Sequence, residues 1–280
     1  MQYLSSKSKA IILLICTAIL WSKGGFLIKY IQWHPVAIAG GRSILAALIM
    51  WAYVKKPTFT WSSIQIMGAV AYALTVILFV IANKLTTAAN AILLLYTGPI
   101  YVALFSFWFL KEKITTIDWI TILTVIGGMA LFFMEKLSHD GLLGNIIAIL
   151  AGISFAWLAL CLRKQKDESP LESLILGNIL TGIIGLPFII DSGIPSQQSM
   201  IALIVLGVFQ LGLPYILYSK AIKHVSALDA VLIPVLEPIL NPIWVFLLLG
   251  ESIGIWPMIG GAIIIIAITI RAILYRTKTQ

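Results

Sequence analysis

The sequence predicts an all-α integral membrane protein of ten transmembrane helices, arranged as two inverted five-helix repeats. Its composition, the lengths of its apolar runs and an internal similarity lead to this prediction. Hydrophobic residues make up 60% of the 280 residues and charged residues only 11%, whereas an ordinary soluble domain has about 25% charged residues. Such a chain has too few charges to cover its apolar surface in water, but lipid can solvate that surface.

Ten apolar runs are long enough to cross a bilayer, which takes about 20 mainly apolar residues for each helix. Because the bilayer core offers the backbone no water to bind, these runs are expected to be helical. The connections between them are short. The predicted helices are residues 10–31, 35–53, 62–83, 88–110, 116–135, 141–162, 170–190, 199–219, 225–249 and 254–273.

The basic residues stand in short clusters between the apolar runs. A nucleic-acid-binding protein gathers them on one soluble face instead, so the net charge of +8 does not indicate a nucleic-acid partner. Cytoplasmic loops of membrane proteins are enriched in Lys and Arg. With the N-terminus inside, fourteen basic residues fall on the inner side and three on the outer side. This predicts a multi-pass protein of the cell membrane with both termini in the cytoplasm. The inner set is Lys7, Lys9, Lys55, Lys56, Lys111, Lys113, Arg163, Lys164, Lys166, Lys220, Lys223, Arg271, Arg276 and Lys278, and the outer set is Lys29, Lys84 and Lys136.

The fourth and ninth apolar runs resemble each other. When residues 84–114 are aligned with residues 223–253, ten of the 31 pairs are identical, including Lys84 with Lys223 and Pro99 with Pro238. The alignment predicts two five-helix repeats, residues 1–136 and 137–280. Because five is odd, the second repeat must be inserted upside down relative to the first. Inverted repeats with a substrate site between them, near the bilayer midplane, are the architecture of many secondary transporters.

Several motifs recur in both halves of the chain. The first half carries AILWSKGGFLIKY, HP before GGRSILAAL, TGP and FLKEK, and the second half carries LEPILNPIWVFLLLGE; each half also has a GG pair in its last helix. In these motifs the chain resembles the EamA branch of the drug/metabolite transporter superfamily, although FLKEK has Lys-Glu where the family often has Gly-Glu. The resemblance implies ten spans and transport of amino acids, other metabolites or drugs without ATP. The absence of a G-x-x-x-x-G-K-[ST] segment agrees with this.

Three charged residues stand out deep inside predicted helices, where charge is costly and often functional. Lys23, Arg42 and Glu237 each fall roughly 18–20 Å from the inner face, counting about 1.5 Å for each residue. Tyr96 and Gln210 fall near the same layer. These five residues are the predicted substrate-binding site of a central cavity. A zwitterion would place its carboxylate on Lys23 or Arg42 and its amine on Glu237.

Two alternatives remain open at these charges. Glu237 could form a buried ion pair with Arg42 or Lys23 that only joins helices. Glu237 could also exchange protons, which would make protons a second partner; burial and a nearby cation act on a carboxyl group in opposite directions, so the sequence does not decide.

Prolines interrupt the fourth and ninth helices. Pro234, Pro238 and Pro242 recur every fourth residue and so share one face of their helix, and Pro99 occupies the matching place in the first half. Each removes a backbone hydrogen bond and tends to kink its helix. We expect these positions to act in gating, with a fixed structural bend as the alternative.

The function predicted from these features is secondary transport of small polar metabolites by alternating access, with amino acids or related compounds as substrates and export as the favoured direction. One alternative is a multidrug or quaternary-ammonium carrier that uses Glu237, against which Lys23 and Arg42 argue because they repel cations. A lipid scramblase or membrane scaffold is an alternative of another class. An enzyme is not expected, since no polar or metal-binding cluster marks one interface. Neither a cofactor nor a metal is expected, and the protein is expected to be a monomer or a homodimer.

Overall fold

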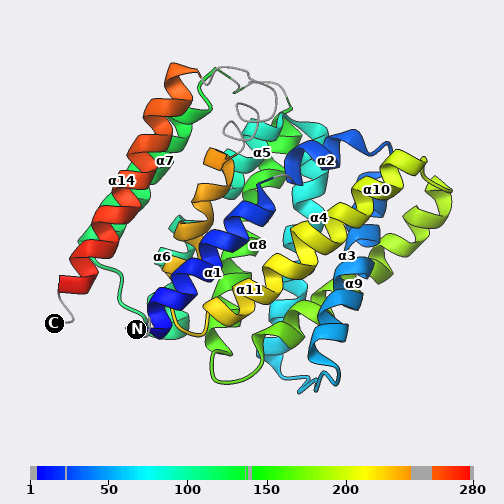
Figure 1. Cartoon of the computed structure of the whole chain (residues 1–280), viewed down its shortest axis with the longest axis horizontal. Helices are drawn as coiled ribbons and strands as arrows, with labels where there is room; N and C mark the ends of the chain where they lie inside the picture. Colours follow the sequence, from blue (N-terminus) through cyan, green and yellow to red (C-terminus); the bar gives the residue numbers. More distant parts are fainter. Residues whose placement is uncertain (1–4, 23, 136, 138–140, 241–253, 278–280) are drawn as a thin grey trace, which may run out of the picture.

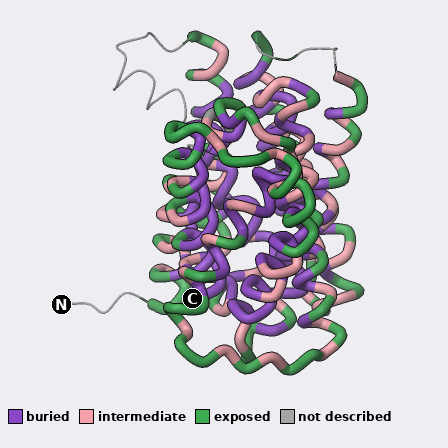
Figure 2. The backbone as a smooth tube through the Cα atoms, turned by 90° about the vertical axis from the view of Figure 1, so that its right-hand side faces the viewer, coloured by how far each residue is buried: buried purple, intermediate pink, exposed green. Residues whose placement is uncertain are grey.

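The chain folds into a bundle of roughly parallel and antiparallel helices (Figure 1). The computed structural model describes residues 5–22, 24–135, 137, 141–240 and 254–277. Buried residues line the inside of the bundle and exposed residues its outer face and ends (Figure 2). Large apolar side chains remain on the outer face: Trp108 is 75% exposed, Leu123 65% and Ile183 64%. Such a surface is suited to lipid rather than to water.

Helices lie within all ten predicted runs. The first five runs contain α1 (Ser6–Trp21) with α2 (Gly24–Tyr30), α3 (Pro35–Val54), α4 (Ser63–Leu85), α5 (Ala88–Leu95) with α6 (Gly98–Leu110), and α7 (Thr116–Phe132). The other five contain α8 (Leu142–Lys164), α9 (Pro170–Ser192), α10 (Gln197–Val205) with η1 (Leu206–Gly212) and α11 (Leu213–Ala221), α12 (Ala227–Leu232) with η2 (Ile233–Val235), and α14 (Ile255–Thr277). Among the described residues, seven segments are long and apolar enough to span a membrane.

Short polar side chains fix where many helices begin. Ser62, Thr87, Ser196 and Ser226 each accept a hydrogen bond from a backbone N–H in the first turn of the helix that follows. Thr115 does the same for α7 in a capping box with Asp118. Such caps satisfy N–H groups that have no partner within the helix. They explain why the predicted starts lie close to the observed ones.

The predicted proline sites coincide with interruptions. Tyr96 and Thr97 separate α5 from α6, and Pro99 lies in the first turn of α6. Pro234 lies in the 3₁₀ turn η2, and Pro238 lies in the helical residues that follow it. Pro242 lies outside the described residues. The missing proline N–H accounts for both interruptions.

Two interruptions were not predicted. The first run was predicted as a single helix, but α1 ends at Trp21 and α2 begins at Gly24. The eighth run contains the π-helix η1, in which the N–H of Leu213 binds the carbonyl of Val208, five residues earlier. Pro214 follows at once and has no N–H to offer the preceding turn, which gives a physical reason for the wider turn.

Glycines let two helix pairs approach closely. A Cβ at Gly40 of α3 would lie 2.7 Å from the Cα of Gly185 of α9, and a Cβ at Gly260 of α14 would lie 2.6 Å from the backbone N of Phe132 of α7. In both pairs, residues later in one helix contact residues earlier in the other. For example, Gly40 of α3 contacts Gly185 of α9, whereas Ile44, later in α3, contacts Gly182, earlier in α9. The two helices of each pair therefore run antiparallel.

Gly260→Ala is expected to destabilise the protein by about 1–3 kcal/mol, because the added methyl group meets the backbone of α7. Gly127→Ala is the matched control, since a Cβ at this exposed position in α7 meets nothing within 4 Å and alanine favours helix. Thermal unfolding in detergent measures both. Equal melting temperatures for the two variants would contradict this packing.

Ion pairs tie the helices at one end of the bundle. We call this the lysine-rich end; it carries the connections 55–62, 111–115, 165–169 and 222–226, and there α1 begins and α14 ends (Figure 1). The buried side chain of Arg271 donates from Nε to Asp118 over 2.8 Å and also binds Asp229. These contacts join α14 to α7 and α12.

Candidate functional site

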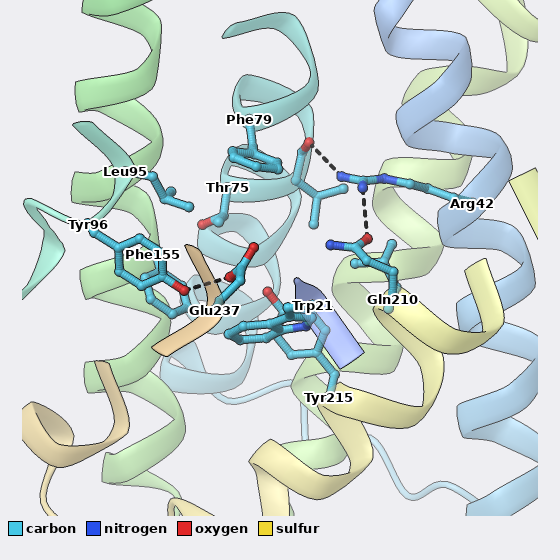
Figure 3. A pocket seen from close by; sticks show the side chains of 12 residues that line it. Trp21, Arg42, Thr75, Phe79, Leu95, Tyr96, Phe155, Gln210, Tyr215 and Glu237 are labelled. Carbon is cyan, nitrogen blue, oxygen red and sulfur yellow. Dashed lines mark hydrogen bonds between the residues drawn. The ribbon is translucent and has the colours of Figure 1, made fainter. Parts of the chain in front are cut away.

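A small cavity lies in the middle of the bundle, between Arg42 and Glu237 (Figure 3). Four predicted site residues line it: Arg42, Tyr96, Gln210 and Glu237. Lys23, the fifth, lies outside the described residues. The other lining residues are Trp21, Thr75, Val76, Phe79, Leu95, Phe155, Leu211 and Tyr215.

Arg42 is a buried cation without a carboxylate partner among the described residues. Its side chain extends from α3, where it is 1% exposed. It donates to the Gln210 Oε1 atom over 3.0 Å and to the Val76 carbonyl over 3.3 Å, and its Nε has no partner. A guanidinium has five N–H donors, so part of this fork is free to bind an anionic group.

Gln210 holds Arg42 from the π-helix η1. Its amide oxygen accepts from the guanidinium, and its amide nitrogen would lie 2.9 Å from a Cβ placed on Gly24. Because Gly24 has no Cβ, the first residue of α2 leaves room for the Gln210 side chain. The π-helix and Gly24 thus place Gln210 against the predicted site residue Arg42.

Glu237 lies on the opposite side of the cavity from Arg42 (Figure 3). It is 7% exposed, and its Oε2 accepts from the Tyr96 hydroxyl over 2.6 Å. The same hydroxyl lies 2.8 Å from the carbonyl oxygen of Pro234. Tyr96 stands at the interruption between α5 and α6, and Pro234 stands in η2, so the two interruptions meet at this carboxyl group.

Arg42 and Glu237 are not bonded to each other. The ion pairs of the described part of the chain join Glu112 to Arg163, and Arg271 to Asp118 and Asp229. The described residues therefore contain no ion pair between Glu237 and Arg42, whereas the alternative pair of Glu237 with Lys23 stays a prediction, since Lys23 lies outside them. The cavity instead has one cationic and one anionic side.

An aromatic layer covers the cavity on the side of the lysine-rich end. The ring of Trp21 lies 5.1 Å from that of Tyr215 and 5.8 Å from that of Tyr218, measured between centroids. Tyr72 and Phe155 complete the layer, at 4.9 Å from Tyr215 and 6.1 Å from Trp21. Aromatic pairs at such distances are stabilising.

Sequence reasoning did not identify Trp21, Thr75 or Phe155 as lining residues. Thr75 donates to the Ala71 carbonyl of its own helix, and the two aromatic side chains pack as core residues do. No pattern in the sequence distinguishes an apolar residue beside a cavity from one in the core.

Comparisons with known proteins agree on a transport family. The profile of the EamA-like transporter family matches residues 8–134 and again residues 142–272. An uncharacterised transporter of Clostridium kluyveri is 26% identical over 249 residues, covering 82% of this chain and 79% of its own. The threonine/homoserine exporter RhtA of Salmonella typhimurium is 26% identical over 223 residues, covering 76% and 73%.

A solved crystal structure shares the fold. It superposes with a TM-score of 0.79 at 16% sequence identity, covering 98% of this chain and 99% of the other. At this identity the likeness concerns the fold alone.

Proposed function

We propose that this chain, which belongs to the EamA-like transporter family, is a secondary transporter of small zwitterionic metabolites such as amino acids. The chain is a multi-pass membrane protein whose relatives are named as transporters. In the proposal, Arg42 binds the carboxylate of the substrate and Glu237 binds its amine.

The observation that carries the proposal is the separation of charge across the cavity. A buried, partly unsatisfied guanidinium stands on one side and a buried carboxyl group on the other, with no ion pair between them. Burying an uncompensated charge is costly. A ligand with both charges would compensate both sides at once, whereas an organic cation would leave Arg42 unpaired and be repelled by it.

Alternating access is proposed to follow from two inverted repeats, residues 1–136 and 137–280. Corresponding helices run antiparallel in both observed pairs, α3 with α9 and α7 with α14. The family profile matches once in each half. Because each repeat can adopt the conformation of the other, inverted repeats allow the cavity to open to one side of the membrane and then to the other.

Two aligned lysines support the same arrangement. Lys84 donates to the carbonyl of Ile31 over 2.6 Å, and Lys223 donates to the carbonyl of Glu168 over 2.6 Å. Lys84 lies in the last turn of α4 and Lys223 lies just after α11, so each ends the third run of its half. Each binds the chain that follows the helices of the first run of its half. The Lys223 contact lies at the lysine-rich end and the Lys84 contact at the opposite end. By the positive-inside rule, we propose that the lysine-rich end faces the cytoplasm.

Amino acids are the proposed substrate class because they carry both charges, and the name of RhtA points the same way for that relative. Thermal unfolding of the purified protein with candidate ligands tests this, because a ligand that binds only the folded state raises the melting temperature with concentration. Amino acids should stabilise the protein, and their methyl esters and quaternary ammonium ions should not. Stabilisation by the quaternary ions alone would replace this proposal by a multidrug carrier.

A further inference from the structure

The Tyr96 hydroxyl touches two acceptors that belong to one interrupted helix. It lies 2.8 Å from the Pro234 carbonyl oxygen and 2.6 Å from Glu237 Oε2. A phenol has one proton to donate, so it can make a full hydrogen bond to only one of them. Whether the other contact is also a hydrogen bond depends on whether the Glu237 carboxyl group carries a proton.

The Pro234 carbonyl lacks the ordinary helical donor. Pro238, four residues later, has no N–H to give it, and the N–H of Leu236 is shared between this carbonyl and that of Ile233. When Tyr96 donates to Pro234, it joins the interruption in the fourth run to the interruption in the ninth. We call this bond the Tyr96 clasp.

The protonation of Glu237 determines whether the Tyr96 hydroxyl donates to Pro234 or to Glu237. A neutral Glu237 can donate its own proton to the phenol oxygen, so Tyr96 donates to Pro234 and all three groups are satisfied. An ionised Glu237 can only accept, and a carboxylate is the stronger acceptor. Tyr96 then turns to Glu237, and the Pro234 carbonyl loses the hydroxyl donor.

We propose that Tyr96 is a positioning residue that couples the proton on Glu237 to the conformation of the two interrupted helices. The clasp is closed while Glu237 is protonated. It opens when the proton leaves to water, or when the ammonium group of a substrate binds the carboxylate in exchange for that proton. At Glu237 the ammonium replaces the proton, which leaves to water, while the carboxylate of the zwitterion adds one negative charge beside Arg42. The substrate step rests on the proposed function, and the proton step does not.

The other titratable groups around Glu237 do not offer it a competing hydrogen bond. Within the described residues, Arg42 of α3 faces it across the cavity, and Tyr215 and Tyr218 of α11 stand near Tyr96. None of the three is hydrogen-bonded to the carboxyl group; Tyr96 is. The clasp therefore depends only on the Tyr96 hydroxyl proton, the proton of Glu237 and the Pro234 carbonyl oxygen that accepts from Tyr96.

Hydrogen–deuterium exchange of the ligand-free protein tests the clasp, read on peptides covering residues 92–100 and 231–240. Wild-type protein should exchange on the order of tenfold faster at alkaline than at acidic pH, after correction for the intrinsic rates, since one buried hydrogen bond is lost. Glu237→Gln should exchange slowly at both, because its amide can donate to Tyr96 as the neutral acid does. Tyr96→Phe should exchange fast at both.

Tyr101→Phe is the matched control, because Tyr101 lies on α6 and makes no described hydrogen bond; it should behave as wild type. Persistent pH dependence in Glu237→Gln, or Tyr96→Phe exchanging as wild type does, overturns the proposal. A zwitterion added at acidic pH should open the clasp in wild type, and failure to do so while binding overturns the substrate step. Failure of the clasp would leave ligand stabilisation intact, so the two proposals fail separately.

Discussion

Replacing Arg42 with alanine is expected to lower the affinity for a zwitterionic substrate, and its transport into proteoliposomes, by about 10- to 100-fold. A hydrogen bond to a charged group contributes about 1.5–3 kcal/mol, and each 1.4 kcal/mol is about tenfold in affinity. Arg42→Lys should recover only part of the loss, because lysine keeps the charge without the planar fork of donors. Uptake of a labelled amino acid measures both variants.

Lys56→Ala is the control for Arg42→Ala, since it removes the same charge from an exposed position at the lysine-rich end. Its transport should equal that of wild type. The melting temperature of Arg42→Ala without ligand separates lost binding from lost folding. Wild-type affinity in a folded Arg42→Ala variant would remove Arg42 from the substrate site.

Replacing Arg271 with alanine is expected to destabilise the protein by about 3–5 kcal/mol, which is the usual effect of removing one partner from a buried ion pair. Asp118 is 1% exposed and would keep its negative charge beside Asp229 without the cation between them. The contacts that join α14 to α7 and α12 would be lost together. Thermal or denaturant unfolding in detergent measures the change.

The same control, Lys56→Ala, removes one positive charge without breaking a described contact and should leave the melting temperature unchanged. If Arg271→Ala unfolded at the same temperature as Lys56→Ala, Arg271 would not hold these helices together. The network would then be a solvated surface feature rather than a structural one.

The helices could be predicted from the sequence because their lengths and starts are local properties. Apolar runs of bilayer length indicated where helices lie, and caps such as Ser62 and Thr87 mark their first turns. Prolines located the interruptions near Pro99 and Pro234. The interruption after Trp21 and the π-helix η1 were missed; in the second, Pro214 was a signal that was not used.

Depth along a helix brought the site residues together, but their contacts could not be predicted. Rise per residue placed Arg42, Tyr96, Gln210 and Glu237 in one layer, and all four line the cavity. Which side chains meet depends on how each helix is rotated against its neighbours. The sequence therefore left an Arg42–Glu237 pair open, whereas Arg42 binds Gln210 and Glu237 binds Tyr96.

The central claim is that Arg42 and Glu237 recognise opposite ends of one ligand. The most direct test compares the affinities of an amino acid, its methyl ester and its deaminated acid for wild type, Arg42→Ala and Glu237→Gln. The claim predicts that Arg42→Ala abolishes only the preference for the amino acid over its ester. It predicts that Glu237→Gln abolishes only the preference over the deaminated acid. If either variant lowered the affinity for all three ligands equally, Arg42 and Glu237 would not recognise opposite ends of the ligand.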